Sequence, residues 1–470
     1  MLKTKLLKGL FIFISISFLI FLIYNSKFLL EKVLSENILN SLKIVKNASE
    51  YIDKIKKNED KLKNVNYKIQ KIASGIDIYE STIYKEKILG VNTNKPLNLK
   101  KFFAPFVAYE NNGQKPVAYS DVYKDDLIFV SGEGKFYRVT SLSKFDKKIH
   151  FKSIKSNLDK ILKYNSIYLE GWFSVKDLLV HNDKIYISLN HEIKKNCFNT
   201  SILAANFDTD NLKFEFFFNP KECLKVDHNG LKYGAPKDAE KNLKKIKDTK
   251  YSESNAHQSG GKMTIYNDNI LLSVGDYRYR ELAQNDDTFF GKILKISLKN
   301  NDNIEIFSKG HRNPQGLIYY NQKKIISTEH GPKGGDEINF IIKDKNYGWP
   351  ISSYGEHYDG VFRESAPLKK SHEEFGFQEP AKYFVPSIGI SDLVKIEKKF
   401  YDNGKENLFV SSLKYKTLYF YELNNELSSI KKIYSFPVGE RIRDLTYIEK
   451  SNLYVMILED SPSIGILFFD

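Results

Sequence analysis

The feature that most constrains the fold is a short apolar, strand-like pattern that recurs six times between residues 128 and 456. The copies read IFVS at Ile128–Ser131, IYIS at Ile185–Ser188, ILLS at Ile270–Ser273, KIIS at Lys324–Ser327, LFVS at Leu408–Ser411 and LYVM at Leu453–Met456. A further apolar strand follows each copy, and loops of very different length separate them. Six sheets of about four strands are typical of a propeller, so we predict an all-β, six-bladed β-propeller.

Two other architectures explain the pattern less well. A β-sandwich would need regular short turns and would not produce six copies, and a parallel βαβ fold would need helices between the strands. We expect the propeller to span residues 64–470. Because the last residues, SIGILFF, read as a strand, we expect them to close the ring with a strand in 64–72, where Val65, Tyr67 and Ile69 alternate.

The first residues predict a membrane anchor. Lys3, Lys5 and Lys8 precede an apolar run at Leu10–Tyr24, which the residues before it extend to a length that can cross a bilayer. The alternative is a cleavable signal peptide, but no small-x-small cleavage site follows the run. We therefore predict a signal-anchor helix at residues 1–27, with its N-terminus in the cytoplasm. The protein is then a single-pass protein of the inner (cytoplasmic) membrane, with its propeller facing the periplasm or the cell exterior.

Residues 28–63 predict a helical stalk. They contain neither Pro nor Gly, and Ile38, Val45 and Ile52 recur at a spacing of seven. This spacing favours a coiled stalk that would make the protein a homodimer, although Glu59 falls in the same series and weakens a long coiled coil. The alternative is one amphipathic helix that lies on the body of the protein or on the membrane surface.

The chain has two cysteines, Cys197 and Cys223. Two apolar strands lie between them about a turn at 208–211, so a hairpin would place the cysteines opposite each other. A disulfide there would close a loop of about 25 residues, would add roughly 3 kcal/mol of stability, and would fit an oxidising compartment. The alternative is a pair of free buried thiols.

The formal net charge is +14, but the lysines are scattered and mixed with Asn and Ile. Nucleic-acid binding needs basic residues that gather on one face or along one helix. We therefore attribute the charge to a compositional bias and expect no nucleic-acid partner.

A candidate ligand site lies between residues 310 and 350, where loops rich in Gly, Pro, Asn and His connect apolar strands. Loops on one face of a propeller converge on its axis, and loops held by a rigid sheet often carry function. The four cationic residues expected near that axis are Arg312, Lys414, Arg441 and Arg443. Their mutual repulsion favours a bound, multiply charged anion, since Arg grips planar carboxylates with two hydrogen bonds. Alternatively, each of them is a solvated surface cation.

Several motifs carry a resemblance to a known family. They are HQSGG at His257–Gly261, SVGD at Ser273–Asp276, AQNDDTFFGKILKI at Ala283–Ile296, GHRNPQGL at Gly310–Leu317, STEHGPKGGDEINFI at Ser327–Ile341 and KNYGWP at Lys345–Pro350. With weaker matches as far as Asp444, this part of the chain resembles the glucose/sorbosone dehydrogenase family, the soluble-type PQQ-dependent aldose dehydrogenases. The family fold is a six-bladed propeller.

The resemblance implies roles for particular residues. His257 would be the general base, and Gly331 and Pro332 would offer backbone carbonyls to Ca²⁺. The residues that would hold PQQ are Arg312, Asn313, Lys414, Arg441 and Arg443.

The resemblance also implies a reaction, in which an aldose is oxidised to its lactone by hydride transfer to PQQ. Electrons would then pass to an external acceptor, a quinone or a cytochrome. Ala256 stands where glucose-oxidising members carry an acid, so the resemblance does not determine which sugar is the substrate. The alternative function is a non-catalytic propeller at the cell surface that binds a ligand or a partner protein.

Overall fold

The computed structural model describes residues 75–86, 96–104, 117–132, 134–161, 175–194, 197–225 and 258–470. All of them belong to one compact unit, Ala73–Asp470. The predicted signal-anchor at 1–27 and stalk at 28–63 lie outside the described residues, and so do the predicted domain boundaries. No helix within the described ranges has the length and hydropathy needed to cross a membrane.

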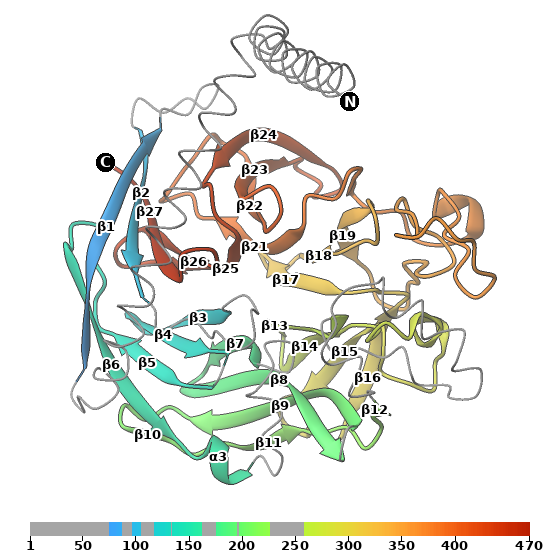
Figure 1. Ribbon diagram of the computed structural model, residues 1–470, viewed down its shortest axis with the longest axis horizontal. Helices are drawn as coiled ribbons and strands as arrows, with labels where there is room; N and C mark the ends of the chain where they lie inside the picture. The colour runs from blue at the N-terminus through green and yellow to red at the C-terminus, as the bar shows by residue number, and fades with distance from the viewer. Residues whose placement is uncertain are drawn as a thin grey trace, which may run out of the picture. The chain divides into compact units, whose positions relative to one another are not determined.

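The described strands form antiparallel groups of four, in which the first strand is the innermost (Figure 1). The first group is β3 (Ala118–Tyr123), β4 (Asp126–Ser131), β5 (Phe136–Val139) and β6 (Lys148–Ser156). The second is β7 (Val175–His181), β8 (Lys184–Lys194), β9 (Cys197–Asn206) and β11 (Glu215–Phe218), with β12 (Leu224–Lys225) also on β9. The third is β13 (Gly260–Tyr266), β14 (Asn269–Val274), β15 (Lys292–Ser297) and β16 (Ile304–Lys309).

The remaining groups repeat this plan. The fourth is β17 (Pro314–Tyr320), β18 (Lys324–Glu329), β19 (Asp336–Ile341) and β20 (Lys382–Phe384). The fifth is β21 (Ile390–Ile396), β22 (Glu406–Ser412), β23 (Thr417–Leu423) and β24 (Ile430–Pro437). The sixth is β25 (Ile442–Ile448), β26 (Leu453–Leu458), β27 (Ser463–Phe469) and β2 (Leu97–Phe103), and β1 (Ile76–Glu86) joins β2 to β6. The short elements are β10 (Asn211–Leu212), α3 (Leu158–Ile161), η4 (Arg280–Gln284) and η5 (Glu373–Phe375).

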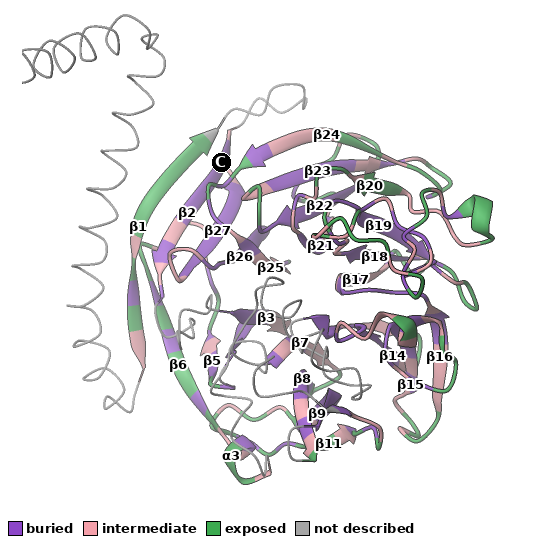
Figure 2. Ribbon diagram, turned by 45° about the vertical axis from the view of Figure 1, so that its right-hand side comes forward, coloured by how far each residue is buried: buried purple, intermediate pink, exposed green. Residues whose placement is uncertain are grey.

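The innermost strands contact one another in a closed cycle, β3, β7, β13, β17, β21, β25 and back to β3, which is the arrangement of a β-propeller. The six apolar repeats are the second strands of these groups, as predicted. They are buried almost throughout, because neighbouring groups cover both of their faces, so they read as continuous apolar runs. Outer strands are more exposed: β6 alternates between buried and exposed residues over most of its length, and β1 and β24 are mostly exposed or half-buried (Figure 2).

The ring closes through β2. The last strand, β27, lies between β26 and β2, with Leu97 opposite Phe469 and Phe103 opposite Ser463. The prediction that residues 64–72 make this contact is therefore wrong. The closing strand was not recognised in the sequence because Lys100 and Lys101 interrupt its apolar pattern. In the structure, the two ammonium groups lie 3.2 Å from Glu80 and 2.8 Å from Glu440, respectively.

The predicted disulfide is confirmed. Cys197 and Cys223 are bonded, with their Cα atoms 5.3 Å apart. Cys197 begins β9, and Cys223 directly precedes β12, where Leu224 pairs with Phe198. The returning side of the predicted hairpin is divided into two short strands, β11 and β12, but it still brings the cysteines together.

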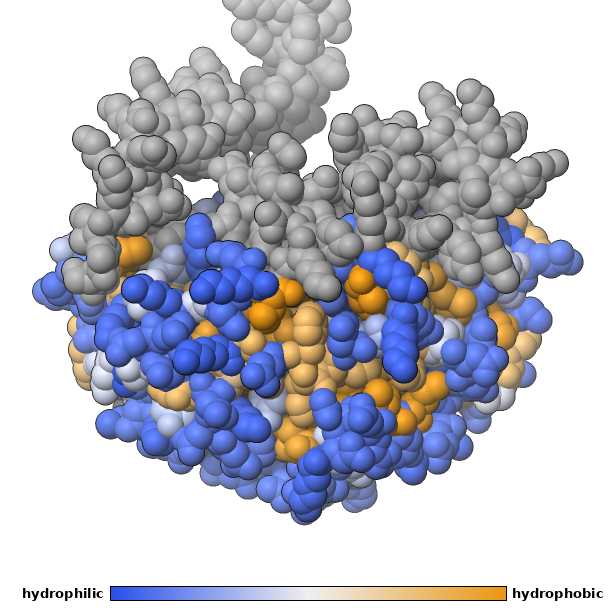
Figure 3. Space-filling view, turned by 90° about the horizontal axis from the view of Figure 1, so that it is seen from below, coloured by the Kyte–Doolittle hydropathy of each residue, from blue (hydrophilic) through white to orange (hydrophobic). Residues whose placement is uncertain are grey.

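Hydrophilic residues cover most of the face seen in Figure 3, and hydrophobic residues gather in smaller patches between them.

A candidate anion-binding cavity

The predicted site residues stand where loops meet inner strands. Arg312 and Asn313 directly precede β17, Arg441 precedes β25, and Arg443 is the second residue of β25. Lys414 follows β22. Because the inner strands surround one axis, these positions are close in space although up to 131 residues of sequence separate Arg312 from Arg443.

A cavity of about 380 Å³ opens among these positions. The predicted residues that line it are Arg312, Asn313, Gly331, Lys414, Arg441 and Arg443. Pro332 follows Gly331 and is buried beside the cavity. His257 lies outside the described residues, but Gln258, its neighbour in the chain, lines the cavity.

The cavity is strongly cationic. Lys176 and Lys262 join the four cations named above, and none of the described residues lining it is an Asp or a Glu. Gln315 also lines the cavity and supplies an uncharged donor and acceptor. It belongs to the HRNPQG motif, which also contains Arg312.

Glu459 holds two of the arginines. Its buried carboxylate accepts a hydrogen bond from Arg441 Nε at 2.7 Å and one from Arg443 Nε at 2.5 Å. Arg443 also donates from Nη1 to Gln315 Oε1 at 3.1 Å. Burial would lower the pKa of Arg443, but the charge and hydrogen bond of Glu459, together with the nearby Tyr119 and Asp444, raise it.

Glu459 corrects one part of the prediction, which treated the repulsion among the cations as relieved only by a bound anion. The protein itself supplies one counter-charge. Glu459 directly follows the buried strand LYVMIL. An acidic residue at the end of a buried strand was the sequence feature that could have indicated a partner for the arginines.

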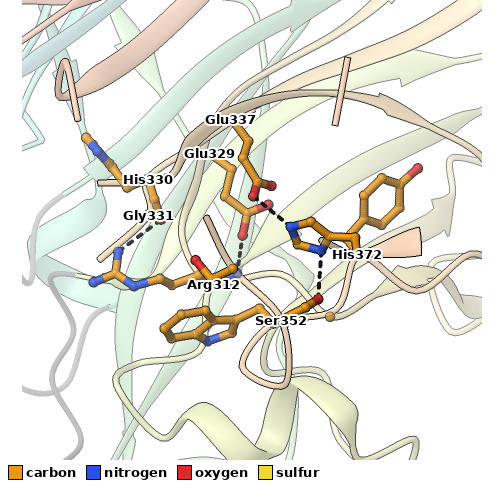
Figure 4. Close-up of a pocket in the computed structure, with 12 residues that line it drawn as sticks. Arg312, Glu329, His330, Gly331, Glu337, Ser352 and His372 are labelled. Atoms are coloured by element: carbon orange, nitrogen blue, oxygen red, sulfur yellow. Dashed lines mark hydrogen bonds and ion pairs between the residues drawn. The ribbon is translucent and has the colours of Figure 1, made fainter. Parts of the chain in front are cut away.

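Arg312 is fixed from two sides. Its Nη1 donates to the His330 carbonyl at 3.0 Å, and its guanidinium lies over the Trp349 ring at 5.3 Å (Figure 4). Trp349 is held in turn, since its Nε1 donates to Asp276 Oδ2 at 2.8 Å. A guanidinium packed on an aromatic ring keeps its planar group in a defined orientation.

Buried polar groups lie next to Arg312 on the side of Glu329 and His372 (Figure 4). Glu329 accepts a hydrogen bond from the Arg312 backbone N–H and lies 3.0 Å from His311 Nδ1. His372 Nε2 lies 3.2 Å from Glu337 Oε1. Burial would lower the pKa of His372, but the hydrogen bond and charge of Glu337 outweigh burial and raise it. Glu329 therefore fixes the backbone of Arg312.

Asn313 connects two neighbouring inner strands. Its Oδ1 accepts from the Gly260 backbone N–H and from Gln315 Nε2, both at 3.1 Å. Because the oxygen is engaged, the amide NH₂ group is the part of Asn313 that can donate to a ligand.

A charged ring lies at the floor of the cavity, and the sequence did not predict it. The third residues of four inner strands form it: Asp177, Lys262, Asp392 and Asp444. The Lys262 ammonium lies 3.2, 3.1 and 3.0 Å from Asp177, Asp392 and Asp444, respectively. Burial raises the pKa of Asp177 to about 8 and that of Asp392 to about 7, although Lys262 opposes both shifts.

Comparisons with known proteins agree with the fold and with the motifs. The sequence model described as "Glucose / Sorbosone dehydrogenase" matches residues 202–465. The aldose sugar dehydrogenase YliI of Escherichia coli is 29% identical over 222 residues, which are 44% of this chain and 59% of that protein. Quinoprotein glucose dehydrogenase B of Acinetobacter calcoaceticus is 32% identical over 126 residues, 21% of this chain and 26% of that protein. The matched part thus spans less than two thirds of either relative.

Solved structures share the fold over more of the chain. The apo-form of the soluble aldose sugar dehydrogenase from Escherichia coli superimposes with a TM-score of 0.58 at 18% identity, covering 80% of this chain and 99% of that one. The PQQ-bound aldose sugar dehydrogenase of Streptomyces coelicolor gives a TM-score of 0.52 at 14% identity, covering 85% of this chain and 99% of that one.

Proposed function

Because the chain belongs to the glucose/sorbosone dehydrogenase family, we propose that it is a PQQ- and calcium-dependent dehydrogenase that oxidises an aldose, or a similar hydroxyl compound, to the lactone. One observation carries the proposal: the loops of several blades bring four cations into one cavity without a lining carboxylate among the described residues. The six-bladed propeller supplies the rigid frame on which they converge.

The donor set fits PQQ. Arg312, Lys414, Arg441 and Arg443 carry four positive charges, and Glu459 removes one of them. The remaining three match the three carboxylates of PQQ. The Asn313 amide can donate to a quinone oxygen, and a cavity of about 380 Å³ lies in the range of small-molecule sites.

The calcium ion would depend on backbone oxygens. Within the described ranges, no three or more His, Cys, Asp or Glu side chains gather as metal ligands. Gly331 lines the cavity, and its loop is tight enough that a Cβ on Gly331 would overlap the carbonyls of Gly334 and Gly335. The Pro332 carbonyl accepts from Tyr358 Oη at 3.2 Å and from Ser387 Oγ at 3.4 Å. Carbonyl oxygens suit Ca²⁺, so Gly331 fits this role directly, and Pro332 would have to release its two hydroxyl partners.

PQQ, when bound, supplies a hydride acceptor. The task left to the protein is to remove the proton of the sugar C1 hydroxyl, which we assign to His257. A neutral imidazole is suited to accept a proton near neutral pH. The position of Gln258 on the cavity wall supports this assignment, since it brings the chain to the cavity directly beside His257. Arg312 on Trp349 would hold the cofactor in place while the proton moves.

We further propose that residues 1–27 anchor the protein in the inner membrane, with the propeller outside the cytoplasm. The Cys197–Cys223 disulfide supports an oxidising compartment. Turnover would require an external electron acceptor, a quinone or a cytochrome. A coiled stalk at 28–63 would make the protein a homodimer.

The test uses the full chain in detergent, loaded with PQQ and Ca²⁺, a panel of aldoses and a reducible dye. We expect dye reduction that requires both PQQ and a sugar. His257→Ala should abolish turnover and leave PQQ binding intact, whereas activity that survives would show that the base is wrongly assigned. A folded protein that neither binds PQQ nor reduces the dye would favour the non-catalytic propeller.

A further inference from the structure

The cavity contains a cation that the proposed cofactor contacts do not use. Lys176 is the second residue of inner strand β7. Arg443 and Gln315 are the second residues of β25 and β17, and all three side chains line the cavity. A Cβ on Gly261 of the next inner strand would overlap the Lys176 side chain, so a glycine with a φ of +111° leaves the room that this lysine occupies.

Charge balance singles out Lys176. Arg441 and Arg443 share Glu459, and the acids of the floor ring surround Lys262. Arg441 and Arg443, with the charge of Glu459 subtracted, supply one net positive charge. With Arg312 and Lys414, this makes three positive charges for the three cofactor carboxylates. Among the residues that the structure describes, no carboxylate forms an ion pair with the Lys176 ammonium.

The surroundings of Lys176 make its charge costly in the absence of an anion. Burial lowers the pKa of Lys176 to about 7, the Arg443 guanidinium adds to the effect, and the Glu459 charge opposes it. The other titratable side chains among the described residues that line the same cavity are Tyr119, Lys262, Arg312, His330, Tyr358, Lys414, Arg441 and Arg443. A buried ammonium beside another cation is stabilised when an anion joins it.

We propose that Lys176 selects anionic aldoses, its ammonium pairing with the carboxylate of a uronic acid. This inference rests on the proposed function and leaves the reaction at C1 unchanged, since a uronic acid retains the C1 hydroxyl. The single charge of the Lys176 ammonium matches a monoanion, which favours a sugar carboxylate over a phosphate dianion.

The test compares kcat/KM for glucuronate and for glucose in the PQQ- and Ca²⁺-loaded full chain. The ratio should fall roughly tenfold or more in Lys176→Gln, because a charge-assisted hydrogen bond is lost. Lys184→Gln is the matched control, since Lys184 is exposed at the opposite end of the β7–β8 hairpin. In the wild type, the ratio should also fall as the pH rises from 6 to 8.5 and Lys176 loses its proton, whereas Lys176→Gln should not show this fall.

Calorimetry supplies a second measurement that does not depend on turnover. Methyl β-glucuronide, which is blocked at C1, should bind the wild type more tightly than methyl β-glucoside, and Lys176→Gln should remove the difference. An unchanged preference in Lys176→Gln would overturn the inference. The same would follow if that variant lost PQQ affinity alone, which would make Lys176 a cofactor ligand. Absence of turnover of either sugar would count against the proposed function instead, and the calorimetry would still decide the role of Lys176.

Discussion

At the scale of single residues, Glu459 determines how the cavity presents its arginines. Each carboxylate oxygen takes the Nε of one arginine, and Arg443 uses a further nitrogen on Gln315. A guanidinium can make these contacts and still offer nitrogens to a ligand, whereas an ammonium cannot reproduce that geometry.

We therefore predict that Arg443→Lys weakens PQQ binding by roughly tenfold, although it conserves the charge. Fluorescence titration of PQQ measures the effect. Lys432→Arg on the exposed strand β24 is the control and should leave the dissociation constant unchanged. Equal affinity of Arg443→Lys and the wild type would show that charge alone holds the ligand.

The sequence predicted the site residues that belong to a recognisable motif, but it did not predict the residues outside the motifs that hold them in place. The HRNPQG and RIRD segments pointed to Arg312, Asn313, Arg441 and Arg443, and the cavity contains all four. Glu459 lies outside every motif and acts through contacts that only the folded chain creates.

At the scale of elements, the inner strands share a register that separates two functions. Second residues of these strands, such as Lys176 and Arg443, line the cavity, and third residues, such as Asp177 and Lys262, form the ring on its floor. The acids in this ring were visible in the sequence, but their convergence was not, because it depends on strand register across several blades.

The ring predicts a pH-dependent stability. A folded-state pKa of about 8 for Asp177 and of about 7 for Asp392 lies above the unfolded value, so the stabilisation is fully present below pH 4 and is lost as the pH rises towards 8. The free energy of unfolding should therefore decrease between pH 5 and pH 8, by up to about 1.4 kcal/mol per pH unit for each group. Asp177→Asn should flatten this decrease in urea unfolding curves, and the exposed Asp302→Asn should not; identical slopes would contradict the role of the ring.

The disulfide predicts a second effect on stability. Replacing Cys197 and Cys223 by Ser should lower the free energy of unfolding by about 3 kcal/mol, because the unfolded chain regains the freedom of the closed loop. Urea denaturation with and without reductant measures the difference. Reductant should destabilise the wild type and leave the double variant unaffected, and a wild type that does not respond would contradict the prediction.

At the scale of the whole molecule, the repeats predicted the ring but not its closure. Apolar repeats mark second strands in every blade, whereas β2 carries two lysines among its apolar residues and lies far from the repeat that it completes. Closure by β2 joins residues near 100 to the last strand, so the ring depends on a contact between distant parts of the chain.

We predict that a chain lacking residues 1–72 keeps a cooperative unfolding transition, and that a chain lacking residues 1–104 loses it. The second deletion removes β2 and exposes the edge of β27, which favours aggregation. Circular dichroism during heating, together with light scattering, distinguishes the outcomes. Equal cooperativity of the two chains would show that closure by β2 is dispensable.

The central claim is that the cationic cavity is a PQQ site at which a sugar is oxidised. The most direct measurement is the ultraviolet–visible spectrum of the full chain titrated with PQQ in the presence of Ca²⁺, before and after an aldose or a uronic acid is added. The account predicts a saturable change in the PQQ spectrum that is weaker in Arg443→Lys, followed by bleaching of the quinone absorption when the sugar is added. A folded protein that leaves the PQQ spectrum unchanged at every concentration would contradict the account.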